Sequence, residues 1–302
     1  MKNSGRISIS KGLSEHRKMP AWLSGSLVVG AFGLLWLLER RRALRREVEP
    51  KLRRNARNLA VAAFAAASLQ LIERPLIEPL TSLVERRRLG LLKLVRLPSW
   101  LEVTFAVVLM DYTLYVWHVL MHLLPFLWRF HVAHHVDLDL DASTALRFHF
   151  GELAIASGWR AGQVVLIGVS PLSLSVWQTF LLLSALFHHS NVRLPINVER
   201  KLNRLLVTPR VHGIHHSIVD EETNSNWSSG LTVWDWLHGT LRLNVPQDRI
   251  TIGVPAYREP EEVKLVDVLR MPFVEQRPTV LPPGNGGAQR VNSMGAAHQL
   301  LP

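Results

Sequence analysis

Residues 118–135 read HVLMHLLPFLWRFHVAHH and contain two groups of histidines, spaced H-x3-H and H-x2-HH. A third group, again H-x2-HH, follows at residues 212–216. Side chains three and four positions apart share one face of an α-helix, so each group directs its imidazoles into one small volume. Eight imidazoles directed at one point exceed what a single metal ion needs. The spacing therefore predicts a histidine-rich centre for two metal ions.

Other histidines allow more than one interpretation. His188 and His189 end an apolar segment, where either ligation or capping at a membrane interface fits them. His149 fits a capping role, or support of a ligand, at least as well as ligation. The predicted ligands of the three groups are His118, His122, His131, His134, His135, His212, His215 and His216. The histidines with no predicted role are His16, His238 and His298.

Apolar segments occur at residues 21–38, 58–72, 100–124, 152–168 and 172–189. The first carries no charge and is followed by Glu39 and three arginines instead of a small-residue cleavage site, which favours a retained membrane helix. Val169-Ser170-Pro171 between the last two segments predicts a hairpin turn. We expect an all-α integral membrane helical bundle with about four or five membrane-embedded helices. The histidines would form a helical cap on its cytoplasmic side.

Two basic segments conflict with a simple topology. The positive-inside rule places the basic connector at residues 40–57 on the cytoplasmic side. Residues 83–98 alternate apolar and basic side chains, as an interfacial amphipathic helix does. If residues 58–72 spanned the bilayer, these two basic segments would lie on opposite sides. One of these assignments must therefore change, and one solution is that residues 58–72 insert only partially.

The basic excess is confined to the first part of the chain. Residues 1–98 contain 20 Lys or Arg against 7 Asp or Glu, whereas the remainder is nearly neutral. Basic residues beside membrane helices mark topology and contact with anionic lipids, so no nucleic-acid partner is expected. The chain has no cysteine, which excludes disulfides, thiolate zinc sites and a resident iron–sulfur cluster.

One stripe of the segment 100–124 is polar. Asp111, Tyr115, His118 and His122 follow one another at helical spacing and share a face. An ionisable residue inside a membrane segment is a functional candidate. Two interpretations of Asp111 remain open: it orients a histidine ligand, or it pairs with an arginine and holds helices together.

Imidazole suits zinc, copper, iron and nickel. The histidines outnumber the ligands of a structural zinc site, and the protease pattern H-E-x-x-H and the Glu-x-x-His pattern of carboxylate di-iron bundles are absent from the sequence. A haem carrier would leave most of these histidines unexplained. A di-iron centre with nitrogen ligands remains, and such a centre activates dioxygen for attack on a C–H bond. The alternative is a membrane metal carrier or sensor, which would require a polar path across the bilayer.

Several further short sequence motifs accompany the histidines. They are LWRFH at residues 127–131, TALRFH at 144–149, FHHSN at 187–191 with LP at 194–195, TPR at 208–210, and WD at 234–235 with GT at 239–240. Together with the histidine order they resemble bacterial members of the sterol desaturase/fatty acid hydroxylase superfamily, over roughly residues 100–245. This chain departs from the family pattern at Val119, at residues 226–228 and at His238, and none of these departures removes a histidine ligand.

The resemblance implies an O2-dependent, non-haem di-iron oxidoreductase. The eight grouped histidines would hold two iron ions, and His189 matches a further ligand position. Asp111, His149 and His188 remain candidates for supporting the ligands. The substrate would be a sterol, a fatty acyl chain or a related lipid, hydroxylated or desaturated. Because the chain has no reductase motif, electrons would come from a separate cytochrome, ferredoxin or flavoprotein reductase.

The expected organisation has four parts. Residues 1–98 form a basic tail, membrane helices and an amphipathic connector, and residues 99–245 form the di-iron domain. Residues 246–277 are a C-terminal extension, and residues 278–302 are expected to be a disordered tail. We expect a multi-pass protein of the bacterial inner membrane, with the metal site on the cytoplasmic side.

Overall fold

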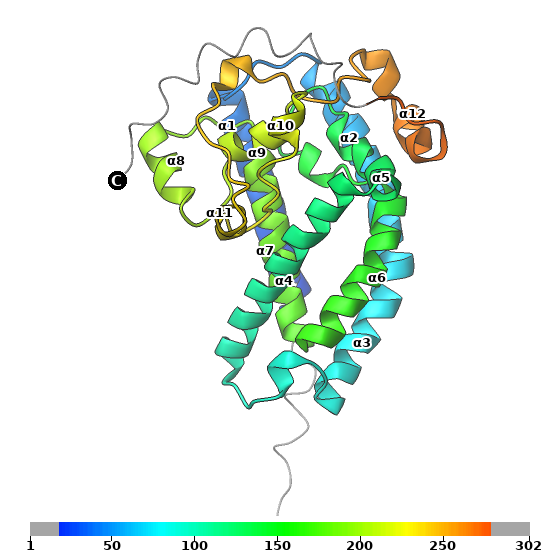
Figure 1. Cartoon of the computed structure of the whole chain (residues 1–302), viewed down its shortest axis with the longest axis vertical. Helices are drawn as coiled ribbons and strands as arrows, with labels where there is room; N and C mark the ends of the chain where they lie inside the picture. The colour runs from blue at the N-terminus through cyan, green and yellow to red at the C-terminus, as the bar shows by residue number, and fades with distance from the viewer. Residues whose placement is uncertain (1–17, 279–302) are drawn as a thin grey trace, which may run out of the picture.

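The computed structural model describes residues 18–278, and within that range the regular secondary structure is helical, with loops and isolated β-bridges between the helices (Figure 1). The expected disordered tail lies outside the described residues except for Pro278, as do His16 and His298. The long helices are α1 (Ala21–Arg41), α2 (Lys51–Ser68), α3 (Arg74–Arg87), α4 (Ser99–Leu123), α5 (Pro125–His135), α6 (Phe150–Ile167) and α7 (Pro171–His189). The short helices are α8 (Ile196–Leu202), α9 (Pro209–His215), α10 (Asp220–Thr223), α11 (Val233–Leu237) and α12 (Leu265–Arg270).

Four helical stretches in the described part are long and apolar enough to cross a membrane. They are α1, the stretch Lys51–Lys93 that contains α2 and α3, α4, and α7. The shorter α6 packs against α2, α3 and α4, and Arg160 in its interior lies 4.1 Å from the ring centre of the fully buried Trp177 on α7. A cation over a desolvated indole ring contributes about 2 kcal/mol. The predicted all-α membrane bundle is confirmed.

The stretch from Lys51 to Arg87 differs from what the sequence predicted for residues 58–72 and 83–98. A π-helical turn, Leu69–Glu73, joins α2 to α3 without a break. Residues 58–72 therefore lie within one continuous helical stretch that is long and apolar enough to cross a membrane, which favours a full span over the partial insertion. The interfacial helix expected at residues 83–98 does not form, because α3 ends at Arg87 and only a short 3-10 turn, Leu91–Lys93, follows.

Backbone conformation explains where α3 ends. Arg88 adopts a left-handed conformation with φ of 52°, and Gly90 follows with φ of 91°. A Cβ at Gly90 would lie 2.3 Å from the backbone nitrogen of Gly168, so the two chain segments can approach only as glycines. This contact holds the loop after α3 against the turn between α6 and α7, at the end of the bundle away from the histidines.

The hairpin predicted between the last two apolar segments is confirmed. Gly168, the residue after the end of α6, is left-handed with φ of 86°. The Ser170 hydroxyl then accepts a hydrogen bond from the Ser173 amide, and Pro171 occupies the first turn of α7. Because α6 and α7 run antiparallel, the start of α6 and the histidines that end α7 lie at the same end of the bundle (Figure 1).

This topology predicts that the loops at the two ends of Lys51–Lys93 lie on opposite sides of the membrane. Val48 and Leu94 flank this span and are 69% and 78% exposed. In the cysteine-free chain, Val48→Cys and Leu94→Cys should each react with an impermeant maleimide from one side only, and from opposite sides. Reaction of both cysteines from the same side would contradict the full span.

Candidate metal centre

Four helices bring the histidines to one end of the bundle (Figure 1). His118 and His122 lie on the last turns of α4. Extended Leu124 and then Pro125 end that helix and begin α5, which carries the second group. The third group comes from α9 and the residue after it, and His189 is the last residue of α7.

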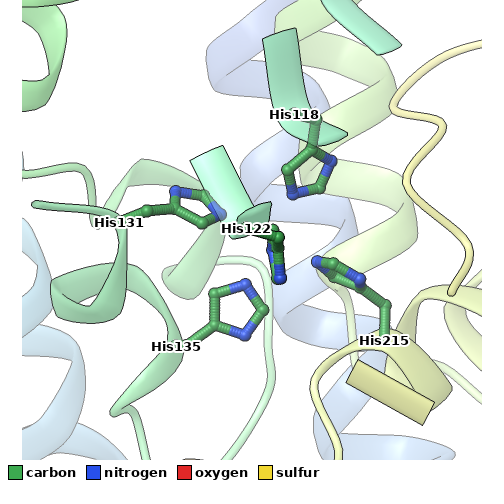
Figure 2. A group of neighbouring side chains, drawn as sticks. All are labelled: His118, His122, His131, His135 and His215. Atoms are coloured by element: carbon green, nitrogen blue, oxygen red, sulfur yellow. The ribbon is translucent and has the colours of Figure 1, made fainter. Parts of the chain in front are cut away.

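The nine histidines that the sequence marked as ligands gather into two sets. In each set, one ring nitrogen of every histidine lies within 4.8 Å of the others. The first set consists of His118, His122, His131, His135 and His215 (Figure 2). The second set consists of His134, His189, His212 and His216. The sets are adjacent, because the rings of His135 and His216 stack with their centres 4.3 Å apart.

Backbone carbonyls determine which ring nitrogens carry protons. Nδ1 of His118 lies 2.7 Å from the Trp227 oxygen, and Nδ1 of His215 lies 2.9 Å from the Ser225 oxygen. A carbonyl oxygen only accepts hydrogen bonds, so both Nδ1 atoms carry the proton and both Nε2 atoms keep a free lone pair. The Nε2 atoms of all five histidines in the first set are buried without a hydrogen-bond partner.

The second set shows the same convergence through short contacts. Nε2 of His189 lies 3.0 Å from Nε2 of His134 and 3.0 Å from Nε2 of His212. His189 Nδ1 donates to the Ala185 carbonyl at 2.9 Å, so its Nε2 holds a lone pair between two other nitrogens. Lone pairs that converge on one buried point are what a cation with nitrogen ligands stabilises, so both sets fit a metal ion.

Burial keeps the rings uncharged. It is the main cause that lowers the pKa of His134, His135, His212 and His216 well below the ordinary value, and repulsion from neighbouring imidazoles adds to it. Burial likewise lowers the pKa of His215 to about 3. These imidazoles are therefore neutral at pH 7, which is the form that binds metals.

Glu152 is a candidate functional residue that the sequence reasoning missed. It lies in the first turn of α6, and its Oε1 is 3.2 Å from Nδ1 of His131. A carboxylate on the far nitrogen fixes the ring of a metal ligand and strengthens it as a donor. Twenty-one residues separate this pair, so no spacing rule connects them. The available signal was a lone acid at the start of an apolar segment.

The three predicted supporting residues have different surroundings, and neither histidine set includes any of them. Asp111 is 1% exposed and accepts hydrogen bonds from the Leu231 amide and from the Trp234 indole, at 2.9 and 2.7 Å. These contacts take the place of the arginine that one interpretation expected, since Asp111 forms no ion pair with an arginine in the described range. Asp111 thus holds α4 to the segment that begins at Leu231.

His188 lies next to the second set, whereas His149 lies just before α6 and packs against Phe130. The His149 Nδ1 accepts a hydrogen bond from the Gly151 amide and caps α6, and its Nε2 lies 3.1 Å from the Leu269 oxygen. The capping role considered for His149 is therefore present. The ring centre of His188 lies 4.1 Å from that of His212, and His188 is fully buried.

A buried ionic network supports α5 from the other side. Arg54 of α2 donates to Asp137 at 2.9 Å, and Arg147 donates to the Ala133 oxygen within α5 at 2.8 Å. Burial raises the pKa of Asp137, but Arg54, Arg147 and Arg57 outweigh this and lower it to about 2. Removing one partner of such a network costs about 3–5 kcal/mol because a buried charge is left uncompensated. The network therefore fixes the end of α5 that carries His134 and His135.

Comparison with known proteins agrees with this geometry. The fatty acid hydroxylase family matches residues 103–240, which include every histidine of both sets. No solved structure matches the chain.

Three relatives illustrate the range of the similarity. Ornithine lipid hydroxylase OlsE of Rhizobium tropici is 33% identical over 52% of this chain and 46% of its own length. Human cholesterol 25-hydroxylase is 29% identical over 51% of this chain and 53% of its own length. Human alkylglycerol monooxygenase is 30% identical over 43% of this chain and 28% of its own length. The chain thus matches about half of the first two relatives and less of the third.

Two separate sets of nitrogens predict two metal ions per chain. We expect elemental analysis of protein from iron-replete cells to approach two irons, and His212→Ala to lower this towards one, because the substitution removes a ligand from the second set only. His298→Ala, outside both sets, is the control and should retain two. A single zinc and no iron in the wild-type protein would contradict the prediction.

The contact between Glu152 and His131 predicts weaker metal binding in Glu152→Gln. Loss of the carboxylate charge should lower metal affinity by about 10- to 100-fold, as is typical of groups that orient a metal-bound histidine. Competition with a chelator measures the affinity, and Glu221→Gln, an exposed position, serves as the control. An unchanged affinity would exclude this role for Glu152.

Proposed function

We infer, from a chain whose residues 103–240 belong to the fatty acid hydroxylase family, that this protein is an O2-dependent di-iron hydroxylase or desaturase of a membrane lipid. The observation that carries the proposal is the pair of buried histidine sets with converging lone pairs, situated where membrane helices end. No carboxylate or thiolate joins either set, in agreement with an all-nitrogen iron site.

A di-iron pair held by the two histidine sets would supply oxygen activation and abstraction of hydrogen from an unreactive C–H bond. In a hydroxylation, one oxygen atom enters the C–H bond and the other leaves as water, at the cost of two electrons and two protons. The chain holds the lone pairs of His118, His189 and His215 inward, because each Nδ1 donates to a carbonyl. Burial of the same rings keeps bulk water from the centre.

A lipid is the substrate class that best fits the surroundings. The candidate centre lies at the ends of α4 and α7, two of the helices long enough to cross a membrane, so an apolar substrate can reach it from the bilayer. The three relatives are named for an ornithine lipid, cholesterol and an alkylglycerol, which share only their lipid character. Hydroxylation agrees with all three names. The three lipids differ, so the names indicate a class of substrate and not an individual lipid.

The metal carrier or sensor is the weaker alternative. A carrier requires polar groups that lead ions across the bilayer. The ionisable side chain at the centre of α4, Asp111, is already committed to the Leu231 amide and the Trp234 indole. The oxygenase is therefore preferred.

The proposal also includes an electron donor and the side of the membrane on which the metal site lies. A cytochrome, ferredoxin or flavoprotein reductase would supply the electrons, because no reductase motif occurs in the sequence. The basic connector between α1 and α2 lies at the histidine end, where the Val48 and Glu49 amides donate to Asp139. The positive-inside rule then favours a cytoplasmic metal site, in a bacterial inner membrane.

The proposal predicts that turnover requires both dioxygen and an intact ligand set. His135→Ala should lower the oxygen-dependent formation of a lipid product by about 100-fold or more, because the loss of an imidazole alters the metal site itself. Lipid mass spectrometry of cells that express each variant measures the product, with His16→Ala as the matched control. Equal product without dioxygen would defeat the oxygenase, and metal uptake without any lipid product would favour the carrier.

A further inference from the structure

A segment that contains the short helix α11 lies along the middle of α4. Residues 231–240 contact α4 through the bonds of Leu231 and Trp234 to Asp111, and through Tyr115, whose hydroxyl lies 3.1 Å from that of Thr240. The rings of Tyr112 and Trp234 also pack with their centres 4.9 Å apart. The segment is thus fixed at a known level of a helix long enough to cross the membrane.

That level lies well inside a bilayer. Asp111 is 12 residues from each end of Ser99–Leu123, or about 18 Å at 1.5 Å per residue. The whole helix measures about 37 Å, whereas the hydrocarbon layer is about 30 Å thick. Wherever that layer begins along the helix, Asp111 lies more than about 10 Å inside it. The segment bound to Asp111 must therefore reach the same depth.

The side chains of this region match a lipid environment. Trp236 and Leu237 on α11 are 71% and 60% exposed, and Leu205 is 63% exposed. Leu205 belongs to the same surface, because its carbonyl accepts a hydrogen bond from the Thr232 amide. Exposed apolar side chains in one contiguous group mark a surface that contacts a membrane or a partner.

Several polar groups of the region are paired within the protein, which lowers the cost of a position within lipid. The Asp235 carboxylate accepts hydrogen bonds from the Trp227 and Ser228 amides and from the Thr240 hydroxyl. The Thr240 amide donates to the Asp235 carbonyl. His238, which is exposed, stacks on Tyr115 with ring centres 5.0 Å apart.

Basic residues accompany the apolar ones on the adjoining stretch. Arg200, Lys201 and Arg204 are exposed on α8 and just after it, beside exposed Val198 and Leu202. Apolar and basic side chains mixed in this way are typical of a segment in the interface, where arginine and lysine meet lipid phosphates.

We propose that residues 196–206 and 231–240 form a wedge that enters the leaflet on the histidine side. In this wedge Leu205, Trp236 and Leu237 contact acyl chains, and the basic residues of α8 contact anionic lipid phosphates. The wedge continues directly from the residues that hold the candidate ligands, since the Ser225 and Trp227 carbonyls accept from His215 and His118. Lipid therefore surrounds one flank of the candidate centre at the depth of α4's midpoint.

Spin labels at single cysteines test the depth of the wedge in the full chain. Labelled Leu237→Cys in nanodiscs with phosphatidylglycerol should collide readily with oxygen and poorly with a water-soluble nickel chelate. The ratio of its collision rate with oxygen to that with the nickel chelate should match the ratio for Leu34→Cys, which is on membrane helix α1 and 58% exposed. The ratio should differ from that of the exposed Glu221→Cys. Val233→Cys provides a second position, and metal content shows that each variant is folded. A ratio at both wedge positions equal to that of Glu221→Cys would overturn the proposal.

The phosphate contact has its own test. A variant with Arg200→Gln, Lys201→Gln and Arg204→Gln should expose a label at Leu205→Cys at least about twofold more to the nickel chelate in phosphatidylglycerol nanodiscs. The same substitutions should have no effect in phosphatidylcholine nanodiscs, which carry no net negative charge. Equal accessibility in both lipids, with and without the substitutions, would exclude an anionic lipid partner. Neither experiment depends on enzymatic turnover.

Discussion

Nine imidazoles in one volume, eight buried and His122 half-buried, are unfavourable unless each has a defined proton and a defined direction. The chain meets this constraint by giving the outer nitrogens of His118, His189 and His215 a backbone carbonyl, and that of His131 a carboxylate. Each such contact turns the opposite nitrogen inward with its lone pair free. These acceptors come from the helix ends and from the loop that carries Ser225 and Trp227. The positions of these segments relative to the histidines are therefore fixed.

The polar networks outside the centre also hold the histidines in fixed positions, but they act through the backbone segments that carry them. The ion pairs of Arg54 and Arg147 hold the loop after α5, and Arg147 also contacts the carbonyl of Ala133 between the histidines of that helix. On the opposite side, Asp111 holds the segment that follows Trp227. A rigid frame on both sides is needed because a metal site tolerates only small displacements of its ligands.

The depth of the histidine-bearing region in the bilayer determines how a lipid substrate reaches the candidate centre. Because Asp111 binds the cap at the midpoint of α4, part of the cap lies beside the membrane helices and not only above them. The same segment forms an apolar outer surface through Trp236 and Leu237, and the residues shortly before it, Ser225 and Trp227, accept hydrogen bonds from His215 and His118. An apolar substrate therefore needs no route through water to approach the centre from this flank.

Local sequence determined the parts that obey short-range rules. Helical spacing placed His131, His134 and His135 on one helix, and Val169-Ser170-Pro171 marked the hairpin, because these signals act within one or two turns. The continuous helical stretch through residues 58–72 was not predictable in this way, since the polar residues near it are buried or paired by distant partners. Glu152 beside His131 and the bonds of Asp111 likewise join residues 21 to 123 positions apart. Only the tertiary structure decides such pairs, because hydrogen bonding and burial depend on distance in space and not on spacing in the chain.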